Sequence, residues 1–580
     1  MKNILILCSL IFYFFPYSSF AESHKLLANP STNTLQKIDN QNQQRQRLQN
    51  KAREQQLNSE QNILFPTKQS SLNLPQKEKH CYSIKKIALQ NFNNPNISSQ
   101  YKTELNFALK KLKINLPYCF GVQGLNTLMK QVQNQLIEQG FVTTRVVLKE
   151  QNLRSGILFL TVIPGKVGRL IVEDSSARVR FTPLTNWSSL AFQSGDILNV
   201  RDIEQSLENL KRVPSIEANM EILPSAYIGE SDIKISYKQR SPVRFSLGLN
   251  DGGSTATGKY QGNATFSIDN LLTMNDLFYA DFTHSLKSKE DDKGYRNSYN
   301  LNFHYSIPFR YWLLSFDHST NQYQQEVFGA FQNYRYSGNS KTQKAKLSYT
   351  LYRDSHRKTK LWAGLWFRQS DAFIDGEAID VQHRRTAGWE GGIQHKEFFN
   401  FGSLDLALSY KRGTGAFDAK HAPEELFDEG TSRPKIVFTH LALNIPFQIG
   451  QQAWQYDFDF HGQWNRNRLT HQDQFSIGGR YSVRGFDGEL TLSGDKGWTL
   501  QNTLTWQYKN YHQVYIGLDY GKVYKIQEQA IGDHLMGAVL GLRGNLFGLN
   551  YEIFAGKPLN KPVGFRTSKT TMGFNLSYQF

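Results

Sequence analysis

Alternation of polar and apolar side chains over the C-terminal part of this chain constrains its fold more than any other feature. From about residue 242 onward, segments of about ten residues alternate in this way and are separated by turns of Gly, Asn, Asp or Lys. In residues 259–268 one face carries Tyr260, Gly262, Ala264, Phe266 and Ile268, and the other carries Lys259, Gln261, Asn263, Thr265 and Ser267. A single such strand fits a soluble sandwich as well as a membrane barrel. Its repetition is typical of a transmembrane β-barrel with a polar interior.

The length of this region and its last residues define the barrel further. Residues 241–580 hold about 16 antiparallel strands, at roughly ten residues per strand plus turns. The final strand places Met572, Phe574, Leu576, Tyr578 and Phe580 on its apolar face. We interpret Phe574, Leu576, Tyr578 and Phe580 as a C-terminal signal for assembly into an outer membrane.

Composition excludes a helical membrane protein. The mean hydropathy is −0.52, 39% of the residues are hydrophobic, and no run of about 18 apolar residues follows the N-terminal segment. That segment, residues 1–21, combines Lys2, an apolar stretch over residues 4–17 and an ending in small residues at Ala21. These are the parts of a secretory signal peptide, so we expect the mature chain to be exported.

Cysteine content and net charge leave more than one interpretation open. Cys8 lies within the signal segment, which leaves Cys81 and Cys119 in the mature chain. In an oxidising compartment these two form either one disulfide or two buried free thiols. The net charge of +17 fits nucleic acid, anionic lipid, exported polypeptide or a wide hydrated lumen, and it selects none of them alone.

Residues 22–80 are rich in Gln and Asn and contain one stretch of good helix formers, residues 32–59. This stretch has almost no apolar stripe, so it cannot pack on a hydrophobic core. It is either a helix that lies in water or in a polar cavity, or a disordered linker. Residues 70–79, with Pro75, have the composition of a linker.

Two compact α/β units follow, at residues 81–167 and 168–240, and both are expected in the order β-α-α-β-β. The first is expected to contain a strand at 81–89, helices at 101–114 and 122–138, and strands at 141–148 and 157–162. The second is expected to contain a strand from residue 170, a helix at 203–211, and strands at 216–223 and 233–237. Gly140 is placed to end the second helix of the first unit.

A long, glycine-rich connection follows the eleventh expected strand and contains Val483-Arg484-Gly485-Phe486. Strand counting puts this connection on the extracellular side, and its length allows it to fold back into the lumen. The next strand but one carries Gly517, Asp519 and Gly521. Because the apolar residues of that strand, such as Leu518, face lipid, pleat parity points Asp519 into the lumen.

Arg484 and Asp519 therefore carry opposite charges toward the same space. A guanidinium holds a carboxylate through two parallel hydrogen bonds, so the two residues are able to fasten a loop inside a pore. The alternative is that they are two unrelated solvated charges, and the residues alone leave both interpretations open.

These features together resemble the TpsB transporters of two-partner secretion, in the superfamily of the outer-membrane barrel-assembly insertase. The resemblance rests on two α/β units before a barrel of about 16 strands, on the motifs at 483–486 and 517–521, and on the terminal Phe580. The two units resemble periplasmic POTRA domains, and in the first the likeness includes Cys81 with Cys119 and residues 140–146 and 151–156. The resemblance spans nearly all of the mature chain.

The resemblance implies a fold and a function. It implies that Arg484, on a lumenal loop, pairs with Asp519 on the barrel wall. It also implies that a helix within residues 32–59 plugs the pore and is joined by a linker to the POTRA domains. The chain would move a large exoprotein, a haemolysin, an adhesin or a contact-dependent inhibition toxin, from the periplasm to the cell surface. The POTRA domains would recognise this client, for which strand addition needs little sequence specificity.

The same resemblance implies a location and partners. The barrel would lie in the outer membrane of a Gram-negative bacterium, with the POTRA domains in the periplasm. The partners would be the secreted TpsA-type exoprotein, outer-membrane lipid and, during biogenesis, the barrel-assembly machinery. A monomer that binds no nucleic acid is expected.

Three other functions are less consistent with the sequence. An outer-membrane insertase of the same superfamily is the nearest alternative, but it would usually carry more POTRA repeats than about 160 residues allow. A ligand-gated import receptor needs about 22 strands. A barrel enzyme needs a nucleophile with its base, and no Gly-x-Ser-x-Gly is present. The 14 histidines are scattered without zinc or calcium spacing, so we expect no catalytic residue, metal or cofactor.

Overall fold

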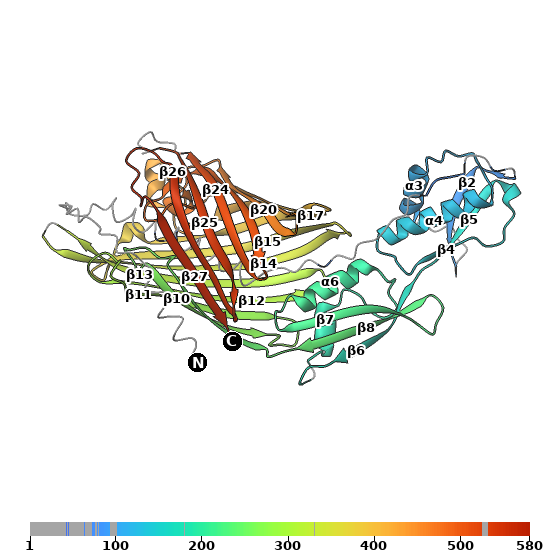
Figure 1. Cartoon of the computed structure of the whole chain (residues 1–580), viewed down its shortest axis with the longest axis horizontal. Helices are drawn as coiled ribbons and strands as arrows, with labels where there is room; N and C mark the ends of the chain where they lie inside the picture. The colour runs from blue at the N-terminus through green and yellow to red at the C-terminus, as the bar shows by residue number, and fades with distance from the viewer. Residues whose placement is uncertain are drawn as a thin grey trace.

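A computed structural model shows a β-barrel with two smaller α/β domains at one of its ends (Figure 1). The structure describes Asn42, Arg45, Ile63 and Glu78, and residues 72–75, 80–92, 101–178, 180–329, 331–524 and 532–580. The expected signal peptide, residues 1–21, lies outside the described residues. So does the expected plug helix, residues 32–59, apart from Asn42 and Arg45. Among the described residues no helix combines the length and the apolar character needed to cross a bilayer.

The barrel is a closed antiparallel sheet of sixteen strands, as the sequence predicted. A two-residue strand, β16 (Glu377–Ala378), pairs with the end of β15 only and does not interrupt the ring, because β15 pairs directly with β17. The barrel strands are β9 (Val243–Asn250), β10 (Tyr260–Asp269), β11 (Leu277–Leu286), β12 (Arg296–Phe309), β13 (Trp312–Phe328), β14 (Asn333–Arg353), β15 (Arg357–Ile374), β17 (Arg384–Phe399), β18 (Gly402–Thr414), β19 (Lys435–Ile449), β20 (Gln452–Asn465), β23 (Lys496–Lys509), β24 (His512–Tyr524), β25 (His534–Leu546), β26 (Leu549–Asn560) and β27 (Thr571–Gln579).

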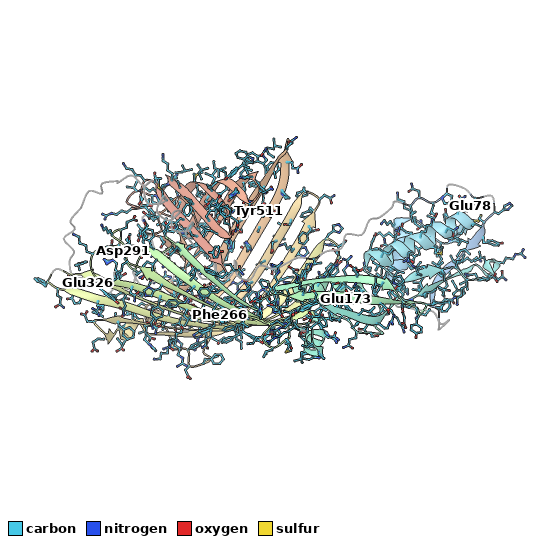
Figure 2. The ribbon with its side chains drawn as sticks, turned by 60° about the horizontal axis from the view of Figure 1, so that its bottom comes forward. Glu78, Glu173, Phe266, Asp291, Glu326 and Tyr511 are labelled. Carbon is cyan, nitrogen blue, oxygen red and sulfur yellow. A yellow bond between two sulfur atoms is a disulfide. The ribbon has the colours of Figure 1, made fainter. Side chains whose placement is uncertain are left out.

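The inner and outer faces of the barrel follow the predicted alternation. On β10, Thr265 and Ser267 are buried in the interior, whereas Phe266 is 41% exposed on the outside (Figure 2). Aromatic side chains also form a belt near the short-turn end of the barrel. Trp312 packs on Tyr349 at 4.5 Å between ring centroids in this belt, whose members also include Phe309, Phe447, Trp454 and Trp506. This belt is the girdle expected where a barrel meets the membrane interface.

The two ends of the barrel differ in the length of their connections. Turns of two residues join β12 to β13, β17 to β18, β19 to β20 and β23 to β24 at one end, and the long connections lie at the other end. Periplasmic turns are short and extracellular loops are long in such barrels. The connection that carries residues 483–486 follows β20, the eleventh barrel strand, and begins at the end with long connections. β20 ends at Asn465, and β23 begins at Lys496.

The first α/β domain departs from the expected order in its strands. The prediction of a single strand at 81–89 is wrong. The strand is interrupted at Lys85, whose main-chain N–H donates to the Gly156 carbonyl. The two halves then pair with different partners, β1 with β3 and β2 with β5. The elements are β1 (Tyr82–Ile84), β2 (Lys86–Asn91), α3 (Lys102–Lys111), β3 (Tyr118–Phe120), α4 (Val122–Glu138), β4 (Arg145–Val147), η1 (Leu153–Ser155) and β5 (Ile157–Ile163).

Helix α4 has the predicted bounds, and the strand expected at 141–148 is shortened to β4. Leu125, Leu128, Val132 and Leu136, spaced by three and four, are buried in the domain core. The N-terminus of α4 is capped by Glu78, which accepts hydrogen bonds from the main-chain N–H groups of Gly121, Gln123 and Gly124 at 2.7–3.1 Å. A carboxylate there satisfies unpaired donors and complements the helix dipole. Residue 78, expected in the linker, is therefore bound to this domain.

The order β-α-α-β-β predicted two helices in the second α/β domain, but the residue pattern indicated a position for only one of them. The other helix, α5 (Pro183–Ser189), is only seven residues long, so it shows little periodicity, and Thr182 caps it with a reciprocal capping box. The other elements are β6 (Lys166–Asp174), α6 (Val200–Lys211), β7 (Ile216–Pro224) and β8 (Glu230–Gln239). β8 is the central strand, between β6 and β7, and α6 buries Ile203, Leu207 and Leu210 in the domain core.

Candidate functional site

The connection between β20 and β23 builds a small apolar core of its own inside the barrel. It contains η4 (His471–Asp473), β21 (Phe475–Ile477) and β22 (Leu492–Gly494), and β21 pairs with β22. Val483 and Phe486 are 0% and 3% exposed, and they pack with Ile477, Leu492, Val523, Leu535 and Phe565. Phe486 meets Phe565 edge to face, at 5.8 Å between ring centroids. We call residues 466–495 the lumenal loop.

Arg484 contacts Asp519 with both its side chain and its main chain. Its Nε donates to Asp519 Oδ2 at 2.7 Å and its Nη2 donates to Oδ1 at 2.7 Å, in a bidentate arrangement. Its main-chain N–H donates to the same Oδ2 at 2.8 Å. Nη2 also donates to Thr503 Oγ1 at 2.9 Å, on β23. The side chain of Asp519 is 0% exposed, so each carboxylate oxygen depends on Arg484 for compensation.

Glycines on the barrel wall make room for this contact. Gly517 and Gly521 share the inner face of β24 with Asp519. A Cβ at Gly517 would lie 2.7 Å from Arg484 Nη2, and one at Gly521 would lie 2.7 Å from Val483 Cγ2. The two glycines that flank Asp519 in the sequence motif therefore open the space that the loop fills. This physical reason for the Gly-x-Asp-x-Gly spacing was missed from the sequence.

The loop backbone also lies directly on β25 and β26. A Cβ at Gly537 would lie 1.9 Å from the main-chain oxygen of Arg484, and one at Gly556 would lie 2.7 Å from the Cα of Gly485. Gly485 has φ +105°, a conformation that L side chains rarely adopt. Glycine is thus required on both sides of the contact between loop and wall.

Further ion pairs, which sequence reasoning missed, attach the lumenal loop at two other points. Asp473 accepts from Arg368 Nη2 at 2.9 Å and from Lys411 Nζ at 3.0 Å, and its side chain is 1% exposed. Arg480 forms an ion pair with Asp251, which follows β9. The sequence signal for Arg368 and Lys411 was a charge at an inward position of a barrel strand. Pleat parity identifies such a position, but it does not identify the partner.

Arg45 is the described residue that joins the N-terminal region to the lumenal loop. Its Nη2 donates to the carbonyl oxygen of Gly488, and Asn42, one helical turn earlier, is buried at 6% exposure. The carboxylates of Asp487 and Glu489 flank the acceptor and attract the guanidinium. The loop that contacts the wall through Arg484 therefore contacts the N-terminal region four residues later.

The remaining residues singled out in the sequence lie away from this loop. Cys81 and Cys119 are joined by a disulfide, beside the β1–β3 pair. The last strand, β27, closes the barrel against β9, and the Phe580 main-chain N–H donates to the Phe245 carbonyl at 2.8 Å. Phe574 stacks on Tyr260 across the seam, at 5.9 Å between ring centroids. The disulfide and the aromatic residues of β27 are thus structural features of the first domain and of the barrel seam.

A buried charge cluster fixes α6 against the short-turn end of the barrel. Arg353, at the end of β14, donates to Glu204 at 3.3 Å and to Glu208 at 3.0 Å, and Lys358 of β15 also pairs with Glu208. Burial favours the neutral form of Glu208, but Lys358 and Arg353 outweigh burial and hold the pKa of Glu208 below its ordinary value. Ile63 enters the same cluster, since its N–H donates to Glu208 and its carbonyl accepts from Arg353.

The sequence had indicated scattered histidines, but in the structure two of them lie close together. His440 and His461 lie side by side on β19 and β20 and share the carboxylate of Asp459. The lumenal loop, in contrast, presents ion pairs whose oxygens and nitrogens are already bonded to each other. These contacts hold the loop in place against the barrel wall.

Comparison with known proteins gives a consistent result. Residues 229–544 match the family described as haemolysin secretion/activation protein ShlB/FhaC/HecB, residues 101–165 match the ShlB-type POTRA domain, and residues 166–224 match a POTRA domain. The outer membrane transporter CdiB-2 of Burkholderia pseudomallei is 35% identical over 80% of this chain and 79% of its own length. The hemolysin transporter protein ShlB of Serratia marcescens is 23% identical over 67% of each chain. The structure of CdiB from Acinetobacter baumannii superposes with a TM-score of 0.81 and 26% identity, over 97% of this chain and all of that one.

Gly537→Ala should loosen the lumenal loop, because the new Cβ cannot coexist with the Arg484 carbonyl at 1.9 Å. We expect faster cleavage of the loop by an added protease in reconstituted barrels. Gly262→Ala on β10 is the matched control, since its nearest neighbours lie at 3.7 Å and its φ is ordinary. Equal cleavage rates for Gly537→Ala and wild type would show that the loop does not rest on β25.

Proposed function

The chain belongs to the family of haemolysin secretion/activation proteins described as ShlB/FhaC/HecB, and we propose that it exports a large partner exoprotein through its barrel. It lies in the outer membrane of a Gram-negative bacterium, with its two POTRA domains in the periplasm. The relatives that it matches are named as an outer membrane transporter and a hemolysin transporter. The client of this chain is accordingly a TpsA-type exoprotein that reaches the periplasm and leaves at the cell surface.

The observation that carries this proposal is a wide barrel whose lumen is occupied by a loop held through separable ion pairs. A barrel of sixteen strands leaves an aqueous interior. The lumenal loop occupies part of it and rests on the wall through Arg484 and Asp519, without covalent attachment. Such a loop is able to remain fixed while the pore is at rest and to rearrange when a polypeptide enters.

The proposed route begins at the POTRA domains. The second domain is attached to the barrel through α6, so a client bound there is held at the periplasmic mouth. Open edges of the domain sheets, such as β6 and β7, offer main-chain groups to an extended chain, which adds a strand without strict sequence requirements. The client then threads outward, and its folding outside the cell supplies the direction of transport.

A helix within residues 32–59 is proposed to plug the lumen at rest. Its support in the described residues is the contact between Arg45 and the Gly488 carbonyl, together with the burial of Asn42. A helix that is polar on all sides suits a hydrated lumen. Departure of this helix would break the contact with the lumenal loop and clear the path of the client.

The proposal also includes contacts with membrane lipid and with the barrel-assembly machinery. The exposed aromatic belt contacts outer-membrane lipid, and β27 with its terminal Phe580 is the segment that the barrel-assembly machinery would receive during biogenesis. We propose that the protein works as a monomer and without enzymatic activity, since transport needs only binding, release and a path.

Arg484→Ala should abolish export while the barrel still inserts and closes. Removal of the guanidinium leaves the Asp519 carboxylate buried without compensation, which costs roughly 3–5 kcal/mol and frees the loop from the wall. Export is measured as exoprotein in the medium when a TpsA-type exoprotein that the wild type secretes is co-expressed. Arg468→Ala is the control, because Arg468 lies in the same loop, donates to the exposed Asp428 carbonyl at 3.1 Å, and should leave export unchanged. Normal export by Arg484→Ala would refute the role of this contact.

Deletion of residues 32–59 should raise the conductance of single channels in planar bilayers, because the lumen loses its proposed occupant. The undeleted protein, prepared and reconstituted in the same way, gives the baseline. Conductance equal to that baseline would assign these residues to the linker rather than to a plug.

A further inference from the structure

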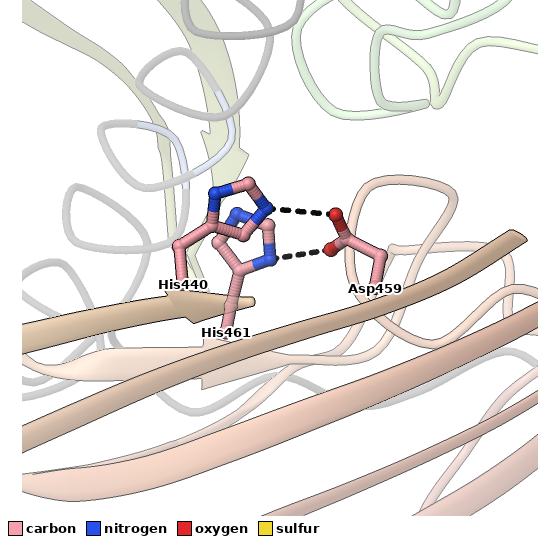
Figure 3. A group of neighbouring side chains, drawn as sticks. All are labelled: His440, Asp459 and His461. Carbon is pink, nitrogen blue, oxygen red and sulfur yellow. Dashed lines mark hydrogen bonds and ion pairs between the residues drawn. The ribbon is translucent and has the colours of Figure 1, made fainter. Parts of the chain in front are cut away.

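His440, Asp459 and His461 form a second cluster on the inner wall of the barrel, separate from the lumenal loop contacts. Asp459 and His461 lie on β20 at alternate positions, on the face opposite Phe458 and Phe460, and are therefore directed into the lumen. His440 on β19 is directly paired with His461 across the ladder. Figure 3 shows the three side chains on the same side of the ribbon, with the carboxylate facing both rings.

The atoms of this cluster are close enough to share one ligand. His440 Nε2 lies 2.8 Å from Asp459 Oδ2, and His461 Nδ1 lies 2.6 Å from Asp459 Oδ1. One atom from each residue lies within 4.8 Å of the other two. Donors around a tetrahedral Zn²⁺ are separated by roughly 3.4 Å, given metal–ligand distances near 2.1 Å. Small side-chain movements, with no change in the strands, would bring the three atoms to that spacing.

We propose that His440, Asp459 and His461 bind a divalent transition-metal ion, for which Zn²⁺ is the representative. Two imidazole nitrogens and one carboxylate oxygen form a donor set that suits Zn²⁺, Co²⁺ and Ni²⁺ and that disfavours the hard cations Mg²⁺ and Ca²⁺. On binding, the ion replaces the two hydrogen bonds between the imidazoles and Asp459, and it is coordinated by His440 Nε2, His461 Nδ1 and an Asp459 carboxylate oxygen. Each imidazole stays neutral, with its proton on the ring nitrogen that does not bind the ion. No co-reactant is required.

The position of the cluster favours binding in two ways. The three side chains are 29–33% exposed, so a hydrated ion in the lumen reaches them. β19 and β20 are paired along their whole length, from Ile436 with Asn465 to Ile449 with Gln452, so the ligands are positioned before binding. Three protein ligands leave at least one coordination position directed at the lumen, as in other open zinc sites.

Other histidines of the barrel show what sets this cluster apart. His304 with Asp317 and His395 with Glu397 each join one imidazole to one carboxylate, at 2.6 Å and 3.7 Å. In the part of the chain that the structure describes, only His440, Asp459 and His461 gather three such side chains within reach of one ion. An ordinary ion pair needs one histidine, and the second imidazole at 4.3 Å between ring centroids completes a metal-binding set.

Metal titration of the full-length protein in detergent tests this site. The protein carries no histidine tag, is first freed of metal with a chelator, and is titrated with Zn²⁺ by calorimetry and with Co²⁺ by visible absorption. We expect one ion per chain, bound equally in the presence of excess Mg²⁺ or Ca²⁺. His440→Gln, His461→Gln and Asp459→Asn should each weaken the Kd by at least about tenfold, which corresponds to 1.4 kcal/mol.

Two matched controls separate the site from general binding to the lumen. His395→Gln removes a histidine that has a single carboxylate neighbour. Asp457→Asn removes the next inward carboxylate of β20, which is bonded to Asn444 and Gln455 instead of to imidazoles. Both should keep wild-type affinity, and heat-modifiable migration in electrophoresis verifies that every variant is folded. No stoichiometric uptake by the wild type, or the same affinity in the three ligand variants, would overturn the proposal and leave the cluster as a hydrogen-bonded bridge.

Discussion

The bidentate contact between Arg484 and Asp519 is the interaction on which the arrangement of the lumen depends. The loop buries one small apolar cluster inside a hydrated barrel, and apolar packing alone is not directional, so specific bonds are needed to fix its position. Here a fully buried carboxylate receives the side chain and the main-chain N–H of the same arginine. Removal of either partner leaves the other charge buried without compensation, so both residues are needed to hold the loop in this position.

The other features of the loop follow from that contact. Val483 and Phe486, on either side of Arg484 and Gly485, enter an apolar cluster, and the wall glycines let the backbone approach closely. Gly488, two residues beyond Phe486, receives Arg45 from the N-terminal region. The loop is therefore connected at once to the wall and to the segment proposed to occlude the pore. Displacement of that segment would break the hydrogen bond from Arg45 to the Gly488 carbonyl of the loop.

A second charged junction connects the periplasmic domains to the barrel. Glu204 and Glu208 of α6 meet Arg353 and Lys358 at the short-turn end, and the Ile63 main chain is held between them. Ile63 therefore lies at the junction between the second POTRA domain and the barrel. Separation of α6 from the barrel would also break the bonds of Glu208 and Arg353 to the Ile63 main chain.

Much of this architecture was predictable, because its determinants are local. Period-two alternation predicted the sixteen strands, and the spacing of Leu128, Val132 and Leu136 predicted α4 with its bounds. Pleat parity alone directed Asp519 inward. The break at Lys85 and the partners of Asp473 were not predictable, since each depends on residues distant in sequence, and α5 is too short to show a clear period. The meeting of His440 with His461 depends on the register of β19 and β20, which a single sequence does not specify.

Hydrogen exchange of the main-chain amides of residues 478–488 tests the central claim most directly, because it measures how often the loop leaves the wall. Wild type, Arg484→Ala, Asp519→Ala and the double variant form a complete cycle. If the two residues act through one contact, each single variant speeds exchange and the double variant is no faster than the faster single. Unchanged exchange in the single variants, or losses of protection that add in the double variant, would contradict the claim that this pair holds the loop.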